Sequence, residues 1–438
     1  MSHRSPARQP DPILETTDAT TMDALVIRGG KPLQGRVVIS GAKNAALPVM
    51  AATLLAPGVH RLRNVPDLRD TRTFASVLRK LGARVEFEGD LCTIDSSNVD
   101  SVEAPYELVK TMRASIYVPG PLLARLGGAR VSLPGGCAWG PRPVNLHLTG
   151  LAAMGANLDI EHGYIVGRDV QLHGAHFTFD IVSVGATAQL MMAAVLAKGT
   201  TVLDNVAIEP DITVLGEVLV ACGARIDGLG SRRLVIHGVK SLRPIDTTII
   251  PDRIEAATFA AAAVITGGSI TLERVIPDHF EASLRKLEEA GGSVVREHDE
   301  VTITGRGRPH AADVTTQVFP GFPTDMQAQM MAVASIADGT SVIEDTIYLD
   351  RFSHVPELAR LGARIELKGN VAVVTGVERL SGAQVMATDL RASAALALGA
   401  LVADGETRIS RIYHLDRGYE KFDQKLTQLG ARVERIQE

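Results

Sequence analysis

The chain has 438 residues, of which 45% are apolar and 22% charged, and its formal net charge is −5. This composition is typical of a globular protein with a sizeable core, and the small net charge disfavours a general nucleic-acid binder, which would carry a basic excess. Its three cysteines form no disulfide framework. The longest apolar run, about ten residues, is half of what a bilayer span requires. We therefore expect a cytoplasmic protein without a membrane span, and the spacing of its cysteines and histidines predicts no metal site.

Residues 1–21 are polar and contain prolines, which predicts a disordered extension rather than a signal peptide. After them one pattern recurs six times: a helix-like segment ends in a small-Gly-small signature, and an alternating strand follows at once. In the first copy, residues 74–81 place apolar side chains at helical spacing, Gly82 suits the left-handed residue that ends a helix, and residues 85–88 alternate. The copies lie about 70 residues apart, which indicates a repeat architecture. They are Leu81–Val85, Met154–Leu158, Cys222–Ile226, Ala290–Val294, Leu361–Ile365 and Leu429–Val433.

Each repeat also contains an alanine-rich helix that begins with small residues. These helices are apolar on nearly every side, so we expect them to be buried, whereas the amphipathic helices before the glycine signatures should face water. Six units are too many for one core, which favours two groups of three with a boundary in the polar stretch 239–248. A stacked solenoid is the disfavoured alternative, because its helices usually keep one wet face. The predicted helix starts are Gly41–Ala46, Thr111–Ser115, Ser183–Thr187, Asp252–Ala257, Pro323–Ala328 and Thr388–Ser393.

One loop stands apart from the repeats. Residues 132–147 contain three prolines and three glycines, a density that excludes a helix or a central strand. In the middle lies Cys137, and Arg142 follows five residues later. A neighbouring cation lowers the pKa of a thiol and favours its reactive form. The alternative is a surface loop with a small apolar residue, because free cysteines are more often simply buried.

Basic residues lie at the predicted starts of helices in different repeats, and one further basic residue lies in a turn. A cation at the start of a helix opposes the helix dipole, so its repetition indicates a shared anionic ligand rather than a contribution to stability. Asp325 and Asp389 also lie at helix starts, where simple capping is the alternative to a functional role. The basic residues are Lys43, Arg113, Arg391 and Arg417.

Longer motifs carry a resemblance that covers the chain from Leu25 to its C-terminus. They are Ser40–Pro48, Lys110–Ser115, Leu133–Cys137, Phe322–Gln329, Met386–Ser393 and Arg411–Tyr419. Together they resemble the enolpyruvyl transferases that act on UDP-N-acetylglucosamine in peptidoglycan synthesis. The resemblance implies an α/β fold, a two-domain inside-out barrel of six βαβαββ-type repeats, three per domain, with the ligand in the cleft between. It further implies one domain of residues 22–42 plus 251–438, a lid-bearing domain of residues 43–250, and a monomer.

The resemblance also implies a reaction: transfer of the enolpyruvyl group of phosphoenolpyruvate to the 3′-hydroxyl of UDP-N-acetylglucosamine, by addition and elimination, with release of phosphate and without a cofactor. Asp325 matches the general base, and Cys137 matches the loop residue that acts as the acid. The full catalytic set is Cys137, Asp325, Lys43, Arg417 and Asp389. The residues expected on phosphoenolpyruvate are Lys43, Asn44, Arg113, Arg142, Arg391 and Arg417. Those expected on UDP-N-acetylglucosamine are Asn44, Arg113, Arg142, Pro143, Val144, Asn145, Leu146, His147, Ser183, Val184, Gly185, Asp325 and Ile347.

A few positions depart from the family pattern. Asn145 stands where the family often has aspartate, Ile181 where some members have a lysine near the diphosphate, and Tyr348 where a phenylalanine is usual. One alternative is the related transferase that acts on shikimate 3-phosphate, but it lacks the Pro-Gly-Gly-Cys loop. Another is a catalytically silent sugar-nucleotide sensor, which should have lost the acid, the base or a cation.

Overall fold

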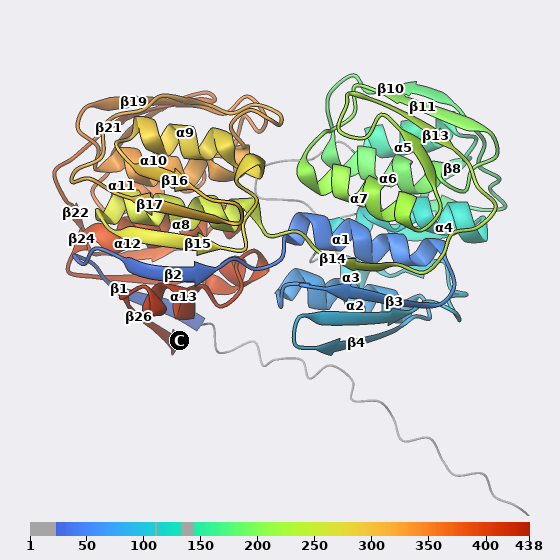
Figure 1. Cartoon of the computed structure of the whole chain (residues 1–438), viewed down its shortest axis with the longest axis horizontal. Helices are drawn as coiled ribbons and strands as arrows, with labels where there is room; N and C mark the ends of the chain where they lie inside the picture. The colour runs from blue at the N-terminus through green and yellow to red at the C-terminus, as the bar shows by residue number, and fades with distance from the viewer. Residues whose placement is uncertain (1–22, 110–111, 134–143) are drawn as a thin grey trace, which may run out of the picture.

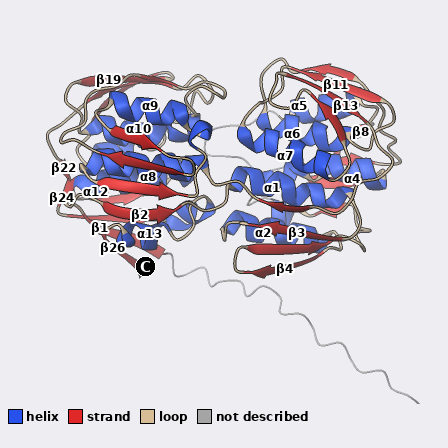
Figure 2. Ribbon diagram, viewed as in Figure 1, coloured by secondary structure: helices blue, strands red, loops and turns tan. Residues whose placement is uncertain are grey.

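The computed structural model describes residues 23–109, 112–133 and 144–438, so the predicted extension at residues 1–21 lies outside it. The chain forms two lobes that lie side by side (Figure 1). Each lobe has its own hydrophobic core, one built from residues 42–249 and the other from residues 25–39 and 254–431. Helices and strands alternate along the chain (Figure 2), which confirms the predicted α/β class.

Six four-stranded sheets, three in each lobe, carry the described fold. In each of these sheets one edge strand pairs in parallel with its neighbour, and the other neighbouring strands are antiparallel. The strands of each sheet are named below in spatial order, starting from that edge strand. The first lobe holds β14 (Asp246–Thr248), β3 (Val59–Arg63), β5 (Leu91–Asp95) and β4 (Arg84–Glu88); β6 (Glu103–Ala104), β7 (Ala129–Ser132), β9 (Tyr164–Gly167) and β8 (Leu158–Glu161); and β10 (His176–Thr178), β11 (Thr200–Asp204), β13 (Arg233–His237) and β12 (Arg225–Asp227).

The second lobe repeats this plan but borrows strands from the start of the chain. Its first sheet is β2 (Gln34–Val38), β15 (Ser269–Glu273), β17 (Glu300–Thr304) and β16 (Ser293–Arg296), and its second is β18 (Val314–Thr315), β19 (Thr340–Glu344), β21 (Val371–Thr375) and β20 (Arg364–Lys368). Its third is β23 (Gln384–Met386), β25 (Glu406–Ser410), β1 (Asp23–Arg28) and β26 (Arg432–Gln437). A two-stranded sheet is formed by β22 (Leu380–Ser381) and β24 (Ala403–Asp404). The N-terminal strand β1 lies between β25 and β26, with Leu25 opposite Ile409 and Arg435.

Two sets of helices connect the strands. The first helix of each repeat packs inside its lobe; in α8, for example, every residue from Ile254 to Ile265 is buried. These helices are α1 (Lys43–Ala52), α4 (Pro119–Leu126), α6 (Val184–Ala194), α8 (Arg253–Thr266), α10 (Gln327–Ser335) and α12 (Leu390–Val402). The second helices are α2 (Arg69–Lys80), α5 (Asn145–Ala153), α7 (Pro210–Ala221), α9 (Glu281–Glu289), α11 (Val355–Arg360) and α13 (Phe422–Gln428). The short elements are α3 (Tyr106–Val109) and the 3₁₀ helices η1 (Thr53–Leu55), η2 (Arg113–Tyr117), η3 (Pro277–His279), η4 (Thr324–Met326) and η5 (Ile412–Arg417).

The glycine signatures end the second helices as predicted. In the first copy Gly82 has φ +104°, a conformation that a side chain with a Cβ rarely adopts, and the matching glycines of the other five repeats have φ between +89° and +111°. One predicted helix start was wrong. Residues 113–117 form the 3₁₀ helix η2, and α4 begins only at Pro119, because proline lacks an N–H and favours the first position of a helix.

The chain passes between the lobes twice, and the two crossings run side by side. The Ala42 N–H donates to Ile250 O at 2.7 Å, and the Asp252 N–H donates to Ser40 O at 2.8 Å. Gly41 lies in the first crossing, where a Cβ would approach Asn64 O to 1.8 Å, so no larger residue fits without a shift. These crossings place the starts of α1 and α8 at the junction of the lobes. No helix in the described ranges is long and apolar enough to span a membrane.

Candidate active site

A buried carboxylate joins cations from the two lobes. Asp70, in the first turn of α2, accepts hydrogen bonds from Lys43 Nζ at 3.3 Å and from Arg417 Nε at 2.9 Å. Lys43 is the first residue of α1, whereas Arg417 ends η5 in the other lobe. Lys43 is 7% exposed and Asp70 5% exposed. The structure therefore brings two of the predicted cations together at the junction of the lobes.

A second buried group surrounds Asp325. Arg351 Nη1 donates to Asp325 Oδ1 at 2.7 Å, and Arg391 donates to Oδ2 from Nη2 at 3.0 Å and from Nε at 3.2 Å. The Arg391 guanidinium also lies over the Tyr419 ring, 5.3 Å from its centroid. Both arginine side chains are almost fully buried. Each oxygen of the predicted base is therefore held by a guanidinium.

The two groups act on each other electrostatically. Burial lowers the pKa of the Lys43 ammonium, Arg391 and Arg417 lower it further, and Asp70 and Asp325 only partly offset this. Burial acts to raise the pKa of Asp325, but Arg391 and Arg351 outweigh it and hold that pKa well below its usual range. The predicted site residues of three separate repeats therefore lie close enough to change the pKa of Lys43; they are Arg391, Arg417 and Asp325, with Lys43 itself.

A hydrogen-bond donor of Arg391 in this charged cluster has no acceptor among the described residues. Arg391 Nη1 is buried and has no hydrogen-bond partner among the described residues. An unpaired buried donor on a charged group costs free energy, and native structures keep few of them. An anionic ligand would provide the missing acceptor, which supports an anion site here.

Capping explains one of the two predicted acidic residues and not the other. Asp389 is the N-cap of α12, where its Oδ1 accepts from the N–H groups of Arg391 at 2.8 Å and Ala392 at 3.0 Å. Asp325 caps nothing, because the N-cap of η4 is Pro323. The alternative of simple capping is therefore wrong for Asp325.

Two groups of the residues predicted for the nucleotide, 144–147 and 183–185, lie at the starts of α5 and α6. Asn145 is exposed, but Leu146 and His147 are buried, and His147 Nδ1 forms a short hydrogen bond with Gln189 Oε1 of α6. Burial lowers the pKa of His147 to about 4, so its ring is neutral at physiological pH. A Cβ at Gly185 would approach this ring to 3.2 Å. His147, in the first turn of α5, therefore packs against α6.

The other predicted site residues that the structure describes form no hydrogen bond or ion pair with the two charged clusters. Ser183 is the N-cap of α6 and accepts from the Ala186 N–H at 3.3 Å. Ile347 lies in the other lobe, in a turn where its N–H donates to Asp345 Oδ1 at 2.9 Å. Val144, Val184 and Asn44 are partly buried. The remaining predictions, Cys137, Arg142, Pro143 and the side chain of Arg113, lie outside the described residues.

Two charged residues of the cluster were missed from the sequence. Asp70 looks like an ordinary acidic residue in the first turn of a helix, and Arg351 lies in an irregular segment between β19 and α11. Their partners, Arg417 and Asp325, are 347 and 26 residues away. For Asp70 the only signal was a charge at a helix start, whereas Arg351 ends a segment, residues 347–351, that resembles residues 412–417, which end at the predicted Arg417.

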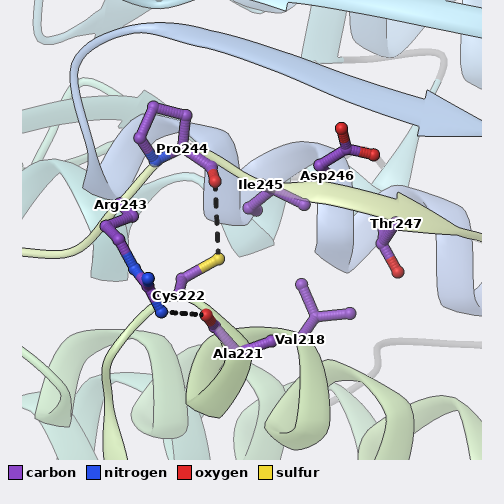
Figure 3. A pocket seen from close by; sticks show the side chains of 8 residues that line it. All are labelled: Val218, Ala221, Cys222, Arg243, Pro244, Ile245, Asp246 and Thr247. Atoms are coloured by element: carbon purple, nitrogen blue, oxygen red, sulfur yellow. Dashed lines mark hydrogen bonds between the residues drawn. The ribbon is translucent and has the colours of Figure 1, made fainter.

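A cavity of about 260 Å³ lies elsewhere, between the C-terminal end of α7 and β14 (Figure 3). Three of its polar side chains form hydrogen bonds: Arg243 donates to Ala221 O at 2.8 Å, the Cys222 thiol to Pro244 O at 3.9 Å, and Asp246 accepts from Arg63 at 2.6 Å. None of the predicted site residues that the structure describes lines this cavity.

Known proteins have similar sequences. The family model of EPSP synthase (3-phosphoshikimate 1-carboxyvinyltransferase) matches residues 27–426. UDP-N-acetylglucosamine 1-carboxyvinyltransferase of Geobacter metallireducens is 55% identical over 417 residues, which is 95% of this chain and 100% of the relative. The protein of the same name from Thermodesulfovibrio yellowstonii is 53% identical over 416 residues, with the same coverage.

Solved structures of enolpyruvyl transferases have a similar fold. The enolpyruvyl transferase NikO from Streptomyces tendae has a TM-score of 0.86 and 29% identity, over 95% of this chain and 99% of that one. An EPSP synthase from Acinetobacter baumannii, 17% identical over 95% of this chain and 100% of its own, has the same fold with a TM-score of 0.73. The chain therefore belongs to the enolpyruvyl transferase family that contains the EPSP synthases and the UDP-N-acetylglucosamine 1-carboxyvinyltransferases.

Proposed function

We propose that this enzyme transfers the enolpyruvyl group of phosphoenolpyruvate to the 3′-hydroxyl of UDP-N-acetylglucosamine and releases phosphate, as a step of peptidoglycan synthesis. The observation that carries the proposal is the buried cluster in which Lys43, Arg391 and Arg417 gather around Asp325 and Asp70. Relatives with more than half of their residues identical support the choice of substrates.

In the proposed addition, Asp325 takes the proton of the sugar hydroxyl while Cys137 gives a proton to the enol carbon. Lys43, Arg391 and Arg417, with Arg142 and Arg113, neutralise the phosphate and carboxylate of phosphoenolpyruvate. A carboxylate held by two arginines is a poor base. The anionic groups of phosphoenolpyruvate therefore also activate the base, because they draw the guanidinium of Arg391 away from Asp325 and so raise the pKa of that carboxyl.

The architecture of the proposed enzyme follows the family. We propose that residues 22–42 plus 251–438 and residues 43–250 act as two domains of the inside-out barrel type, with the substrates between them and the loop of Cys137 as the lid. The separate cores and the paired crossings support this division. The free thiols of Cys92 and Cys222 are consistent with a reducing cytoplasm, where we place the enzyme, as a monomer.

The proposed function is tested by an assay of phosphate release with phosphoenolpyruvate and either of two acceptors. We expect release with UDP-N-acetylglucosamine and none with shikimate 3-phosphate. Release with the shikimate acceptor alone would indicate the related transferase. Binding of the sugar nucleotide without release, across pH 6 to 9, would indicate the silent sensor.

The lowered pKa of Lys43 predicts a pH dependence. We expect kcat/KM for phosphoenolpyruvate to fall on the alkaline side at a pH below 10.5, the ordinary value for lysine, because deprotonation of the free enzyme removes a phosphate-binding charge. In Lys43→Arg the guanidinium stays protonated, so this limb should move to higher pH. An alkaline limb at the same pH in both proteins would assign it to another group.

The three cysteines should differ sharply in reactivity. Burial raises the pKa of the Cys92 thiol to about 12 and also raises that of Cys222, so both should resist alkylation. We expect an epoxide of the fosfomycin type to modify Cys137 alone, as read by peptide mass spectrometry.

We also expect Cys137→Ser to lower kcat by roughly a hundredfold or more, because a hydroxyl is a far weaker acid. An adduct on another thiol, or full turnover by the serine variant, would remove Cys137 from the mechanism.

A further inference from the structure

We propose that Asp70 is a resident anion of the phosphate site: it holds Lys43 and Arg417 in place without substrate and is displaced from at least one of them when the phosphate of the substrate binds. This inference rests on the proposed function, because it assigns the two cations to that phosphate. It makes Asp70 a positioning residue, which acts through the cations rather than on the reacting atoms.

The position of Asp70 suits this role better than a role in its own helix. Asp70 does not cap α2, because its carboxylate accepts from Lys43 and Arg417 and from no backbone N–H group of the helix. An acidic residue that only serves the helix dipole normally faces water, but Asp70 is buried. Its two oxygens are divided between two cations, Oδ2 toward Lys43 and Oδ1 toward Arg417.

The two cations come from different lobes, which gives the carboxylate a structural role at their junction. Lys43 belongs to α1 and Arg417 to η5, and neither has another carboxylate partner among the described residues. Two like charges so close, with Lys43 buried and Arg417 partly buried, would repel each other without a counter-ion, and the site would open or deform. Asp70 prevents this before the substrate arrives.

The same arrangement implies competition. A phosphate group offers the oxygens and the negative charge that Asp70 now offers, so it must take over hydrogen bonds that the carboxylate makes. Binding is then an exchange of anions, in which part of the attraction between the phosphate and the cations is offset by the lost contact with Asp70. Removal of the carboxylate charge should tighten phosphate binding while it loosens the geometry needed for turnover.

The experiment compares the natural protein with Asp70→Asn and Asp70→Glu. Binding of inorganic phosphate is measured by isothermal titration calorimetry, and kcat and KM for phosphoenolpyruvate are measured by chromatography of the enolpyruvyl product. In Asp70→Asn we expect the Kd for phosphate to fall roughly tenfold and kcat to fall about as much, with no rise in KM. Asp70→Glu keeps the charge and should stay close to the natural Kd.

The matched control is Asp67→Asn, which removes a half-exposed carboxylate three residues earlier, paired with Arg72. It should change neither value. An unchanged or weaker phosphate affinity in Asp70→Asn would overturn the proposal. If Asp70→Asn does not fold, Asp70→Ser makes the same charge change; failure of both to fold while Asp70→Glu folds would show a purely structural charge and also overturn it. A natural protein that binds phosphate but releases none from phosphoenolpyruvate would refute the proposed function without deciding the role of Asp70, which the calorimetry decides.

Discussion

Replacement of Asp325 by asparagine is expected to lower kcat roughly a thousandfold, within the range that a general base contributes. The amide keeps the shape of the carboxylate but cannot take the proton of the sugar hydroxyl. Binding of both substrates should persist, so that KM changes little and the loss falls on kcat. Steady-state phosphate release, with binding of UDP-N-acetylglucosamine measured separately, provides both values.

The same substitution should destabilise the fold. It leaves Arg351 and Arg391 buried without a counter-charge, which we expect to cost about 3 kcal/mol in the free energy of unfolding. Since the pKa of Asp325 is lowered in the folded protein, its stabilising contribution is complete above the unfolded pKa, about 3.9, and is lost as pH falls through the folded pKa. The stability difference should therefore be full at pH 7 and shrink only below about pH 4.

Asp338→Asn is the control, because that side chain is 77% exposed and lies 3.8 Å from Arg308. It should leave kcat and the urea midpoint unchanged. Normal turnover by Asp325→Asn would show that another group takes the proton. A loss of stability without loss of kcat in the folded fraction would reduce Asp325 to a structural counter-ion.

Arg391→Lys should lower kcat/KM for phosphoenolpyruvate by roughly a hundredfold or more, although it preserves the charge. The guanidinium reaches Asp325 Oδ2 with two N–H groups and lies over the Tyr419 ring at the same time. An ammonium group has no planar face to lie over the ring and does not hold two donors in the fixed geometry of a guanidinium. The position of Asp325 and the contact with the ligand should both suffer.

Arg360→Lys is the matched control, an exposed arginine of α11 that lies 3.8 Å from Glu357. It should keep the natural kcat/KM. If Arg391→Lys also kept it, charge alone would account for the role of this residue, and the paired Nε and Nη2 contact with Asp325 would be irrelevant to turnover.

The sequence predicted best what is encoded locally. The glycine signatures predicted where helices end, because a left-handed residue at that point needs glycine, and Lys43 and Arg391 were predicted at helix starts, where the structure has them. Residues 113–117 were misjudged because Pro119 delays the helix. The pairing of the N-terminal strand β1 with β25 and β26 depends on contacts across nearly the whole chain, which periodicity does not reveal.

The candidate site shows the same limit. The cations were found through their unusual position, since a positive charge at the start of a helix has no local benefit. Asp70 was missed because an acidic residue in the first turn of a helix is unremarkable beside its own neighbours. Only the packing of one lobe against the other places Arg417 beside Asp70, and only the fold within the second lobe places Arg351 and Arg391 on the two oxygens of Asp325.

The central claim is that cations of both lobes serve one anion. A crystal structure of the protein with phosphoenolpyruvate and UDP-N-acetylglucosamine bound tests it most directly. We expect Lys43 of the first lobe and Arg417 and Arg391 of the second all to donate hydrogen bonds to the same phosphoenolpyruvate molecule. Phosphoenolpyruvate bound by the residues of a single lobe, with Lys43 and Arg417 still joined only through Asp70, would contradict it.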